Sequence, residues 1–426
     1  MTDKRPVALL TVHSCPFSDI GGAENGGMSV YIREVNRALT AQGVPTVIFT
    51  RREDAGAPHE VDLPEGSRLV HINAGPEKPL DKNSVFYHLP EFLDGVAAYA
   101  RDEGVEFRVI HSHYWLSGWV GKRLGELWGV PWLHTAHTLG RVKDRDRPPG
   151  AASEPVLRVA VEDEIVRDCN RLVVHTAQER EDMAVLYGSG RDCVAIVPPG
   201  VDLAVFKPVP HQALSRELGI LPGEKVVLFT GRLERLKGLE TLIFAVASLL
   251  QSGFPGIRLV VLGDDSSSGR LEAGSFAGER ARLEALCAEI GIDDRVSFLG
   301  RVPHDQLPGY YSLADVVAVP SYSESFGLVA LEAQACHTPV VASRVGGLRQ
   351  LVLDGITGYT VARHDPQDYA GALGRILSDD QLRSVMGVAA GRLARAYSWD
   401  ATARRLLDVY AETQSDYLRA AEAVFG

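Results

Sequence analysis

The sequence predicts an α/β protein built from two doubly wound parallel sheets, each at the centre of its own domain. Short runs of β-branched and apolar residues alternate with helical patterns along the chain, which is typical of parallel sheets. With 426 residues the chain is too long for one ordinary core and suits two domains of roughly 200 residues each. Prolines frame residues 199–208, and a second first strand follows them. We therefore expect an N-terminal domain over residues 1–205 and a C-terminal domain over residues 206–398.

The first domain contains the expected alternation of strands and helices. Its predicted strands are residues 6–12, 44–50, 68–73, 107–111, 132–136, 171–176 and 194–197. A helix is expected over residues 29–42, where Gly43 ends it. Gly26 and Gly27 precede this helix and would let a ligand approach backbone N–H groups, although a loop kept flexible by glycine is the alternative. The pattern is not G-x-G-x-x-G, so a dinucleotide cofactor is not supported.

The second domain repeats the arrangement. Its predicted strands are residues 225–231, 258–262, 296–299, 316–319 and 340–342. A helix is expected over residues 327–336, packed back on the strand before it. Residues 264–278 are rich in Gly and Ser and are expected to form a mobile loop.

Composition limits the partners of the chain. A net charge of −11 and a pI near 5.7 disfavour nucleic acid, whose phosphate backbone needs clustered Lys and Arg. No apolar run approaches the roughly 20 residues that span a bilayer, and the N-terminus leads into a short strand instead of a signal sequence. Five cysteines without a C-x-x-C motif are typical of reduced thiols. We therefore expect a cytoplasmic protein.

The stretch over residues 320–340 carries most of the functional information. A buried strand leads through a polar, Gly-containing turn into a helix, whose free N–H groups suit an anion. Glu324 and Glu332 are eight residues apart, which corresponds to roughly 12 Å along a helix. Glycosidase carboxylates flank one bond at about 5 to 9.5 Å, so this pair does not form such a site. A nucleotide sugar, with hydroxyls at both ends and a diphosphate between them, fits the distance; two ordinary surface glutamates are the alternative.

The segment from Glu324 to Glu332 resembles the E-x7-E pattern of retaining glycosyltransferases with two Rossmann-like domains, the GT-B architecture. Residues 231–238, GRLERLKG, resemble the G-R-x4-K-G diphosphate motif of that family, and residues 26–28, 74–76, 111–118 and 134–139 match it as well. The chain is most similar to the enzymes that add N-acetylglucosamine to inositol phosphate in mycothiol synthesis, with sucrose-phosphate synthases as near relatives. The resemblance implies two facing domains, a deep cleft and a C-terminal helix, residues 399–426, that crosses back to the first domain.

The resemblance and the chemistry of the reaction together predict the donor site. Breaking the bond between a sugar and a diphosphate leaves negative charge on the phosphate, so groups that meet this charge accelerate the step. Arg232 would bind phosphate oxygens as a planar fork and Lys237 as a point charge, with a solvated turn as the alternative. No covalent nucleophile is assigned. The expected catalytic residues are His137, Arg232, Lys237 and Glu324, and the expected donor-binding residues are Gly26, Gly27, Arg232, Lys237, Glu324, Phe326, Gly327, Leu328 and Glu332.

Four histidines of the first half raise the question of a metal centre: His111, His113, His134 and His137. An H-x-H pair on a strand places both side chains on one face. However, no carboxylate or cysteine motif accompanies the histidines, and both pairs are expected where strands end, so a metal centre is disfavoured. In the resemblance, the histidine that matches His137 holds a hydroxyl of the donor sugar; core packing is the alternative.

Residues from separate segments match the acceptor site of the inositol-phosphate enzymes, namely His13, Lys82, Tyr114, Thr138 and Arg158. Two cations, a phenol and a hydroxyl would suit a phosphate monoester. The sequence departs from the family pattern at Ser29, where those enzymes carry Asn, and at Glu24, where they usually carry Asp. Both departures lie in the loop that would face the acceptor ring, and they leave the identity of the acceptor open.

Three functions are therefore compatible with the sequence. The first is transfer of N-acetylglucosamine from UDP-GlcNAc to 1D-myo-inositol 3-phosphate. The second is transfer of glucose from UDP-glucose to fructose 6-phosphate, and the third is a nucleotide-sugar 2-epimerase, which needs no acceptor pocket. The UDP-sugar is a co-substrate, and the chemistry requires no cofactor. By resemblance, a structural Mg²⁺ would lie on backbone carbonyls near Tyr311, Ala314 and Thr338, and a homodimer is left open.

Overall fold

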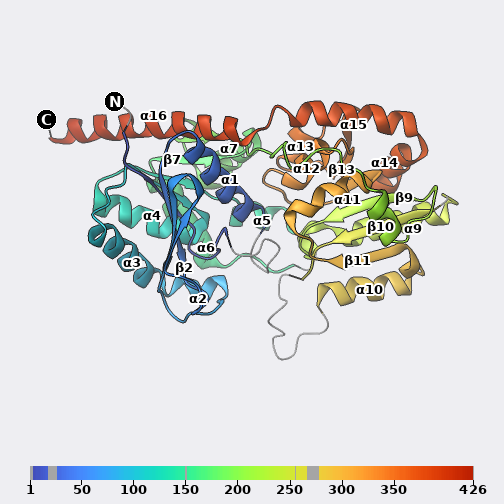
Figure 1. Cartoon of the computed structure of the whole chain (residues 1–426), viewed down its shortest axis with the longest axis horizontal. Coiled ribbons are helices and arrows are strands. Elements are labelled where there is room, and N and C mark those ends of the chain that lie inside the picture. The colour runs from blue at the N-terminus through green and yellow to red at the C-terminus, as the bar shows by residue number, and fades with distance from the viewer. Residues whose placement is uncertain (1–2, 18–25, 149–150, 255, 266–277, 426) are drawn as a thin grey trace.

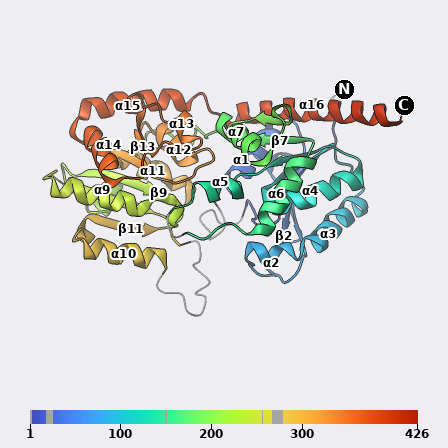
Figure 2. The same ribbon diagram turned by 180° about the vertical axis from the view of Figure 1, so that it is seen from behind.

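The computed structural model describes residues 3–17, 26–148, 151–254, 256–265 and 278–425 (Figure 1). Two lobes lie side by side along the long axis of the molecule, and each contains one sheet flanked by helices (Figures 1 and 2). The prediction of two α/β domains is confirmed. The domain boundaries at residues 205 and 398 stay a prediction. Glu24 and residues 266–277 of the predicted mobile loop lie outside the described residues.

The N-terminal sheet is built around β1 (Val7–Leu10), which is fully buried and pairs in parallel with β2 (Thr46–Arg51) and β5 (Val109–His113). Apolar side chains of β1 alternate between two cores, one on each face, which explains why helices cover both faces. The remaining strands are β3 (Glu60–Leu63), β4 (Ser67–Ile72), β6 (Trp132–Thr135), β7 (Arg171–Val174) and β8 (Val194–Ile196), in the order β3-β4-β2-β1-β5-β6-β7-β8. The helices are α1 (Gly27–Ala41), α2 (Lys82–Phe86), α3 (Leu89–Asp102), α4 (Tyr114–Trp128), α5 (Gly140–Arg145), α6 (Val156–Asp168) and α7 (Ala177–Tyr187), with short 3-10 turns at Pro64–Gly66 and Arg191–Cys193.

The predicted parallel sheet is confirmed, with two differences in detail. The unpredicted edge strand β3 runs antiparallel to β4. The histidine pairs do not all lie at strand ends, because β5 extends two residues further than predicted and places His111 inside it. His134 likewise lies inside β6, where its neighbours on both sides belong to the strand.

The C-terminal sheet is built around β9 (Lys225–Thr230), which lies between β10 (Ile257–Leu262) and β12 (Val316–Val319). All of its neighbouring strands pair in parallel. The other strands are β11 (Val296–Gly300), β13 (Val340–Ser343) and the unpredicted β14 (Gly358–Val361), in the order β11-β10-β9-β12-β13-β14. The helices are α8 (Gln212–Glu217), α9 (Leu239–Gln251), α10 (Glu279–Glu289), α11 (Leu307–Leu313), α12 (Leu328–Ala335), α13 (Leu348–Leu351), α14 (Pro366–Ser378) and α15 (Asp380–Ala394), with 3-10 turns at Arg235–Lys237, Asp293–Arg295 and His304–Gln306.

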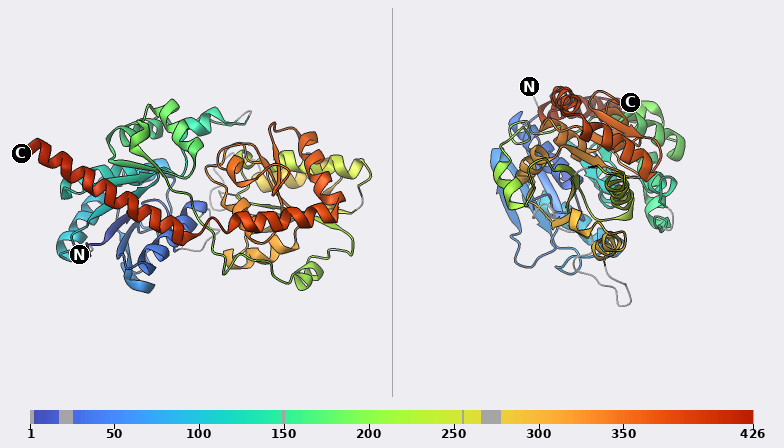
Figure 3. Two further views of the ribbon diagram at one scale, coloured as in Figure 1. Left: turned by 90° about the horizontal axis from the view of Figure 1, so that it is seen from above. Right: turned by 90° about the vertical axis from the view of Figure 1, so that its right-hand side faces the viewer.

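The last helix, α16 (Trp399–Phe425), crosses back and lies along the N-terminal domain (Figure 3), as predicted. Its apolar side joins the core behind β1, and the Tyr410 hydroxyl contacts His111 Nδ1 at 2.8 Å. The chain thus passes between the domains twice, and the two passages touch. Val201 N–H donates to the Tyr397 carbonyl at 3.2 Å, and a Cβ atom on Gly200 would lie only 2.3 Å from the Trp399 nitrogen.

The carboxyl ends of the central strands of both sheets face the boundary between the domains. In each sheet the strands that follow the first one are added on both of its sides, so β1 lies between β2 and β5, and β9 lies between β10 and β12. Ligands of open α/β sheets bind at such switch points. The loops that follow β1, β5 and β6 therefore form one wall of a candidate site, and those that follow β9 and β12 form the other. Helix α5 lies at the boundary in both opposite views (Figures 1 and 2).

Two further properties concern the whole described chain. No helix within the described residues is long and apolar enough to cross a membrane. All five cysteines are described, and each is a free thiol.

Candidate active site

Two residues on the N-terminal wall have strained backbones. Tyr114 follows β5 with φ 74°, and His137 follows β6 with φ 58°, a left-handed conformation that costs free energy for residues other than glycine. Such strain persists where the surrounding structure holds it, and it is common at functional sites. Both residues belong to the predicted site.

The predicted histidines form a buried cluster with His175. Burial lowers the pKa of His111 and of His134 to about 3 and that of His175 to about 4, and it also holds the pKa of His113 and of His137 well below the usual value. These rings are therefore neutral at pH 7. His113 Nδ1 contacts His137 Nε2 at 3.0 Å, so the Nδ1 atom of His137 stays available to a ligand. Within the described residues there is no group of three or more His, Cys, Asp or Glu that could hold a metal ion.

The predicted acceptor residues meet around the ring of Tyr114. The ring of His13 lies 4.4 Å from it between centroids, Lys82 Nζ lies 5.3 Å from its centroid, and the Arg158 guanidinium lies 5.0 Å away. Burial and then the charges of Lys82, Arg158 and Arg232 hold the pKa of His13 well below its usual value. The five predicted acceptor residues, Thr138 included, thus lie close together although they come from separate segments of the chain.

Arg158 is more enclosed than a typical surface cation. Its side chain is 3 % exposed and donates to Glu162 at 2.7 Å, to Glu154 at 2.8 Å and to both oxygens of Thr138 at 3.0 Å. The two carboxylates balance its charge, and the fork of the guanidinium holds Thr138 in place. By contrast, Lys82 is half-buried and has no ion-pair partner in the described part of the chain.

Ser29, one of the departures from the family pattern, is buried beside this wall. Its hydroxyl lies 3.0 Å from the Ser14 hydroxyl. Gly26 is the N-cap of α1, which begins two residues earlier than predicted, and a Cβ atom on Gly27 would lie 3.4 Å from Leu328 of α12. Gly27 therefore lies next to the C-terminal wall.

On the C-terminal wall, Lys237 Nζ donates to Glu324 Oε2 at 2.7 Å. Gly238 makes this possible, because it has φ 69° and any Cβ atom there would lie 2.1 Å from the carbonyl of Pro320. The G-R-x4-K-G loop therefore lies directly on the turn before α12. Arg232 is 43 % exposed and pairs with Glu234 at 2.8 Å.

The backbone of the turn between Glu324 and α12 is tightly packed against its neighbours. Gly327 caps α12 with φ 106°, and a Cβ atom on Gly346 would lie 1.7 Å from the carbonyl of Glu324. Phe326 is buried, and Leu328 begins α12. The backbone N–H groups of the first turn of α12 accordingly have a fixed direction toward the cleft, where they suit an anion.

The turn before α12 contacts the N-terminal domain. Ser325 Oγ donates to the carbonyl of His137 at 2.5 Å. Burial raises the pKa of the nearby Glu179 to about 7, against the opposing effect of backbone N–H groups such as that of His175, which donates to it at 2.6 Å. The catalytic candidates of both domains are therefore brought together in this structure.

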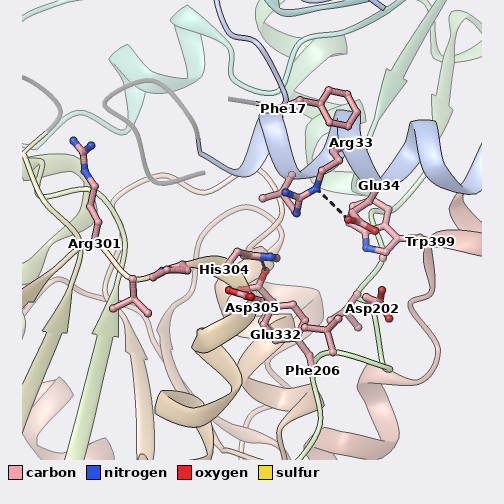
Figure 4. A pocket seen from close by; sticks show the side chains of 16 residues that line it. Phe17, Arg33, Glu34, Asp202, Phe206, Arg301, His304, Asp305, Glu332 and Trp399 are labelled. Atoms are coloured by element: carbon pink, nitrogen blue, oxygen red, sulfur yellow. Dashed lines mark hydrogen bonds and ion pairs between the residues drawn. The ribbon is translucent and has the colours of Figure 1, made fainter. Parts of the chain in front are cut away.

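Glu332 lies away from Glu324, at the base of a cavity of ≈ 790 Å³ between α1, the interdomain chain and residues 301–305 (Figure 4). Its Oε1 atom contacts His304 Nε2 and its Oε2 atom accepts from the Tyr311 hydroxyl, both at 2.9 Å. Sequence reasoning missed His304 and assigned Tyr311 only through its carbonyl. The position of His304 just after the end of β11, at the carboxyl edge of a parallel sheet, is the signal that would have found it.

One of the predicted magnesium ligands, the carbonyl of Tyr311, is engaged in another contact. The Thr338 hydroxyl donates to the Tyr311 carbonyl at 2.6 Å, so one acceptor position of that oxygen is already used.

Sequence and structure comparisons agree with this geometry. Residues 26–200 match a family model described as a glycosyl transferase 4-like domain, and residues 211–393 match glycosyl transferases group 1. Two proteins named D-inositol 3-phosphate glycosyltransferase are similar: that of Xylanimonas cellulosilytica is 44% identical over 95% of this chain and 96% of its own, and that of Corynebacterium jeikeium is 44% identical over the same shares.

Solved structures show the same fold. Sucrose-phosphate synthase from Thermosynechococcus elongatus superimposes with a TM-score of 0.86 at 35% identity, covering 97% of this chain and 100% of that one. Anabaena HepE, solved in complex with UDP-glucose, superimposes with a TM-score of 0.73 at 18% identity, covering 96% and 99% of the two chains. Because relatives above 40% identity span nearly the whole chain, this protein belongs to the group 1 glycosyltransferases and is a glycosyltransferase enzyme with the GT-B fold.

Proposed function

We propose that this enzyme transfers N-acetylglucosamine from UDP-GlcNAc to 1D-myo-inositol 3-phosphate with retention of configuration, as a step of mycothiol synthesis. The observation that carries the proposal is the cationic wall around Tyr114, although the chain as a whole has a net charge of −11. Lys82 brings to this wall a charge with no ion-pair partner among the described residues, and Arg158, balanced by two carboxylates, lies on the same ring. Such a wall suits a phosphate monoester. The names of relatives that are 44% identical point to the same acceptor.

The donor diphosphate would lie between the G-R-x4-K-G loop and the N-terminus of α12. Lys237 has three N–H donors, so it can keep its contact with Glu324 and also reach a phosphate oxygen. Arg232, largely exposed, can turn its planar fork toward the second phosphate. As the sugar–phosphate bond breaks, these donors meet the charge that develops on the leaving group, which lowers the barrier.

The donor sugar would lie between the two domains. Glu324 would accept from sugar hydroxyls, and the free Nδ1 atom of neutral His137 would accept or donate one more hydrogen bond. Ser325 links these two groups through the carbonyl of His137, so domain closure and sugar binding support each other. No side chain is proposed as a covalent nucleophile.

The acceptor phosphate would contact Lys82, Tyr114 and Thr138, with His13 beside them. Lys82 has no ion-pair partner among the described residues and would supply the main charge. Arg158, whose donors already hold Thr138 and two carboxylates, would contribute through the remaining N–H of its fork and through the position of Thr138.

A second candidate is a sucrose-phosphate synthase type reaction, from UDP-glucose to fructose 6-phosphate. The 35% identity and TM-score of 0.86 to the Thermosynechococcus enzyme favour it. Both acceptors carry a phosphate monoester, so the cationic wall is compatible with either. A nucleotide-sugar 2-epimerase is the weakest alternative, because such an enzyme binds no acceptor and leaves the cationic wall around Tyr114 without a function.

The test is an incubation of the purified enzyme with UDP-GlcNAc or UDP-glucose, each offered with inositol 3-phosphate, with fructose 6-phosphate, with unphosphorylated inositol, or alone. We expect UDP release and a new phosphorylated glycoside only with UDP-GlcNAc and inositol 3-phosphate, with the anomeric configuration retained in the NMR spectrum. Turnover of UDP-glucose and fructose 6-phosphate alone would replace the first candidate by the second. Preference for unphosphorylated inositol would refute the acceptor wall. Conversion of the donor without any acceptor would favour the epimerase.

The structural magnesium near Tyr311, Ala314 and Thr338, a homodimer and a cytoplasmic location stay predictions.

A further inference from the structure

The carboxylate of Glu332 is held at both oxygens by side chains that the proposed chemistry does not use. His304 Nε2 lies 2.9 Å from Oε1, and the Tyr311 hydroxyl donates to Oε2 at 2.9 Å. Each carboxylate oxygen has about two acceptor positions, so each oxygen retains one for a ligand. The carboxylate lines the cavity between the domains, although its side chain is only 8 % exposed (Figure 4).

The two partners are fixed as donors. Tyr311 is fully buried, and burial together with the charge of Glu332 raises the pKa of its hydroxyl well above the usual value, so it donates at every accessible pH. Burial lowers the pKa of His304, but the charge of Glu332 and the hydrogen bond to it outweigh that effect and raise the pKa overall. The ring of Phe206 packs at 5.0 Å from His304 and at 6.1 Å from Tyr311, between centroids, which restricts both rings.

The cavity has the size and lining of a small-ligand site. Its volume of ≈ 790 Å³ falls within the range of about 300 to 1,000 Å³ that is typical of such pockets. Apolar side chains such as Val302 and Trp399 line it together with the charged groups of Arg33 and Asp305. A ligand in this cavity would contact one buried carboxylate of fixed orientation, and the rest of the lining is partly apolar and partly charged.

We propose that His304 and Tyr311 are positioning residues that aim the Glu332 carboxylate at the vicinal diol of a ribose, so that the enzyme selects a ribonucleoside diphosphate over its 2′-deoxy counterpart. The inference rests on the proposed nucleotide-sugar donor. The two remaining acceptor positions belong to two adjacent oxygens, and a cis diol presents two O–H donors at a matching separation. Removing one hydroxyl leaves one carboxylate oxygen without its ligand partner while both protein partners stay in place.

The test is calorimetric titration of UDP and of 2′-deoxy-UDP into the wild type and into Tyr311→Phe, His304→Leu and His304→Gln. A hydrogen bond to a charged group corresponds to roughly a 10- to 150-fold difference in affinity, and we expect the wild type to prefer UDP by this factor. Tyr311→Phe and His304→Leu should bring the preference close to one by weakening UDP binding, with little change for 2′-deoxy-UDP. His304→Gln keeps an N–H donor and should retain part of the preference.

Tyr310→Phe is the matched control, because it removes a tyrosine hydroxyl from the same helix outside this contact; the preference for UDP should not change. At saturating donor, kcat of the His304 and Tyr311 variants should stay near that of the wild type, while the KM for the donor rises. Equal losses for both nucleotides, or an unchanged preference, would show that His304 and Tyr311 only support the fold. If neither nucleotide binds the wild type, the nucleotide-sugar donor is itself refuted together with the inference, whereas equal binding of UDP and 2′-deoxy-UDP refutes the inference alone.

Discussion

Mild acid should destabilise the N-terminal domain steeply, because its core contains histidines that are neutral in the folded state. His111, His134 and His175 have pKa values lowered by burial to about 3, 3 and 4. In the unfolded chain a histidine has a pKa of about 6.5. Below that value the unfolded state binds more protons than the folded state, so stability is full above about pH 6.5 and falls as the pH decreases.

The size of the effect follows from these values. Between pH 7.5 and 5.5 each such histidine costs about 1.4 kcal/mol, so these three together cost about 4 kcal/mol. His13 and His113 have pKa values held well below normal and add to the loss. Glu179 acts in the opposite direction: its pKa is raised to about 7, so it gains a proton on folding and returns about 2 kcal/mol over the same range. A net loss of several kcal/mol is a large part of the roughly 5 to 15 kcal/mol that stabilises a typical domain.

Tryptophan fluorescence during urea unfolding measures this loss in the right domain. All five tryptophans lie in the N-terminal domain or in α16, and none lies in the C-terminal domain. The urea midpoint should therefore decrease strongly from pH 7.5 to 5.5. His134→Gln removes one titrating group and should weaken the pH dependence by about 1.4 kcal/mol over this interval.

An unfolding free energy that is constant from pH 7.5 to 5.5 would refute this reasoning, because it would mean that the histidines are charged or hydrated in the folded state.

Three further predictions concern the site. Lys237→Ala should lower kcat by about 10² to 10³ with little effect on acceptor KM in steady-state assays; a near-normal kcat would remove Lys237 from the leaving-group role. Lys82→Met should raise the acceptor KM by roughly 10- to 150-fold and leave UDP affinity unchanged, with Lys78→Met, on an exposed position of the preceding loop, as the control; an unchanged KM would dissociate Lys82 from the phosphate. Glu179→Gln should raise Tm relative to the wild type at pH 8 but not at pH 5, because the amide avoids burying a charge; a Tm difference independent of pH would show that Glu179 does not titrate near neutrality.

The strands that the sequence predicted are those with continuous apolar runs, since burial on both faces leaves this pattern. The two missed strands lie at sheet edges. β3 carries Glu60 and Asp62 on its exposed side, and β14 has four residues and begins with Gly358, so neither shows a hydrophobic run. The ends of β5 were misjudged because polar His111 and His113 continue a strand whose burial only the tertiary fold provides.

The sequence named candidate residues of the site where short motifs carry them. Lys237 and Glu324 belong to two such motifs, but neither motif predicted that their side chains meet at 2.7 Å. The contact between Glu332 and His304 joins residues 28 positions apart that no local pattern links, and only the packing of α11 and α12 brings them together. The enclosure of Arg158 by Glu154 and Glu162 follows i, i+4 spacing, with Glu162 on the same face of α6 and Glu154 just before the helix, and could have been inferred from the sequence.

The two adjacent passages of the chain between the domains restrict how the enzyme can open. A single linker would let one domain swivel and slide freely, but the hydrogen bond from Val201 to Tyr397 ties the passages side by side at one point. Rotation of one domain relative to the other about an axis through this hydrogen bond is the motion that leaves both passages intact. Gly200 has no room for a side chain, and this close contact keeps the two passages from sliding along each other. Donor entry and UDP release would then follow one repeated arc, at the end of which Ser325 returns to the same carbonyl of His137.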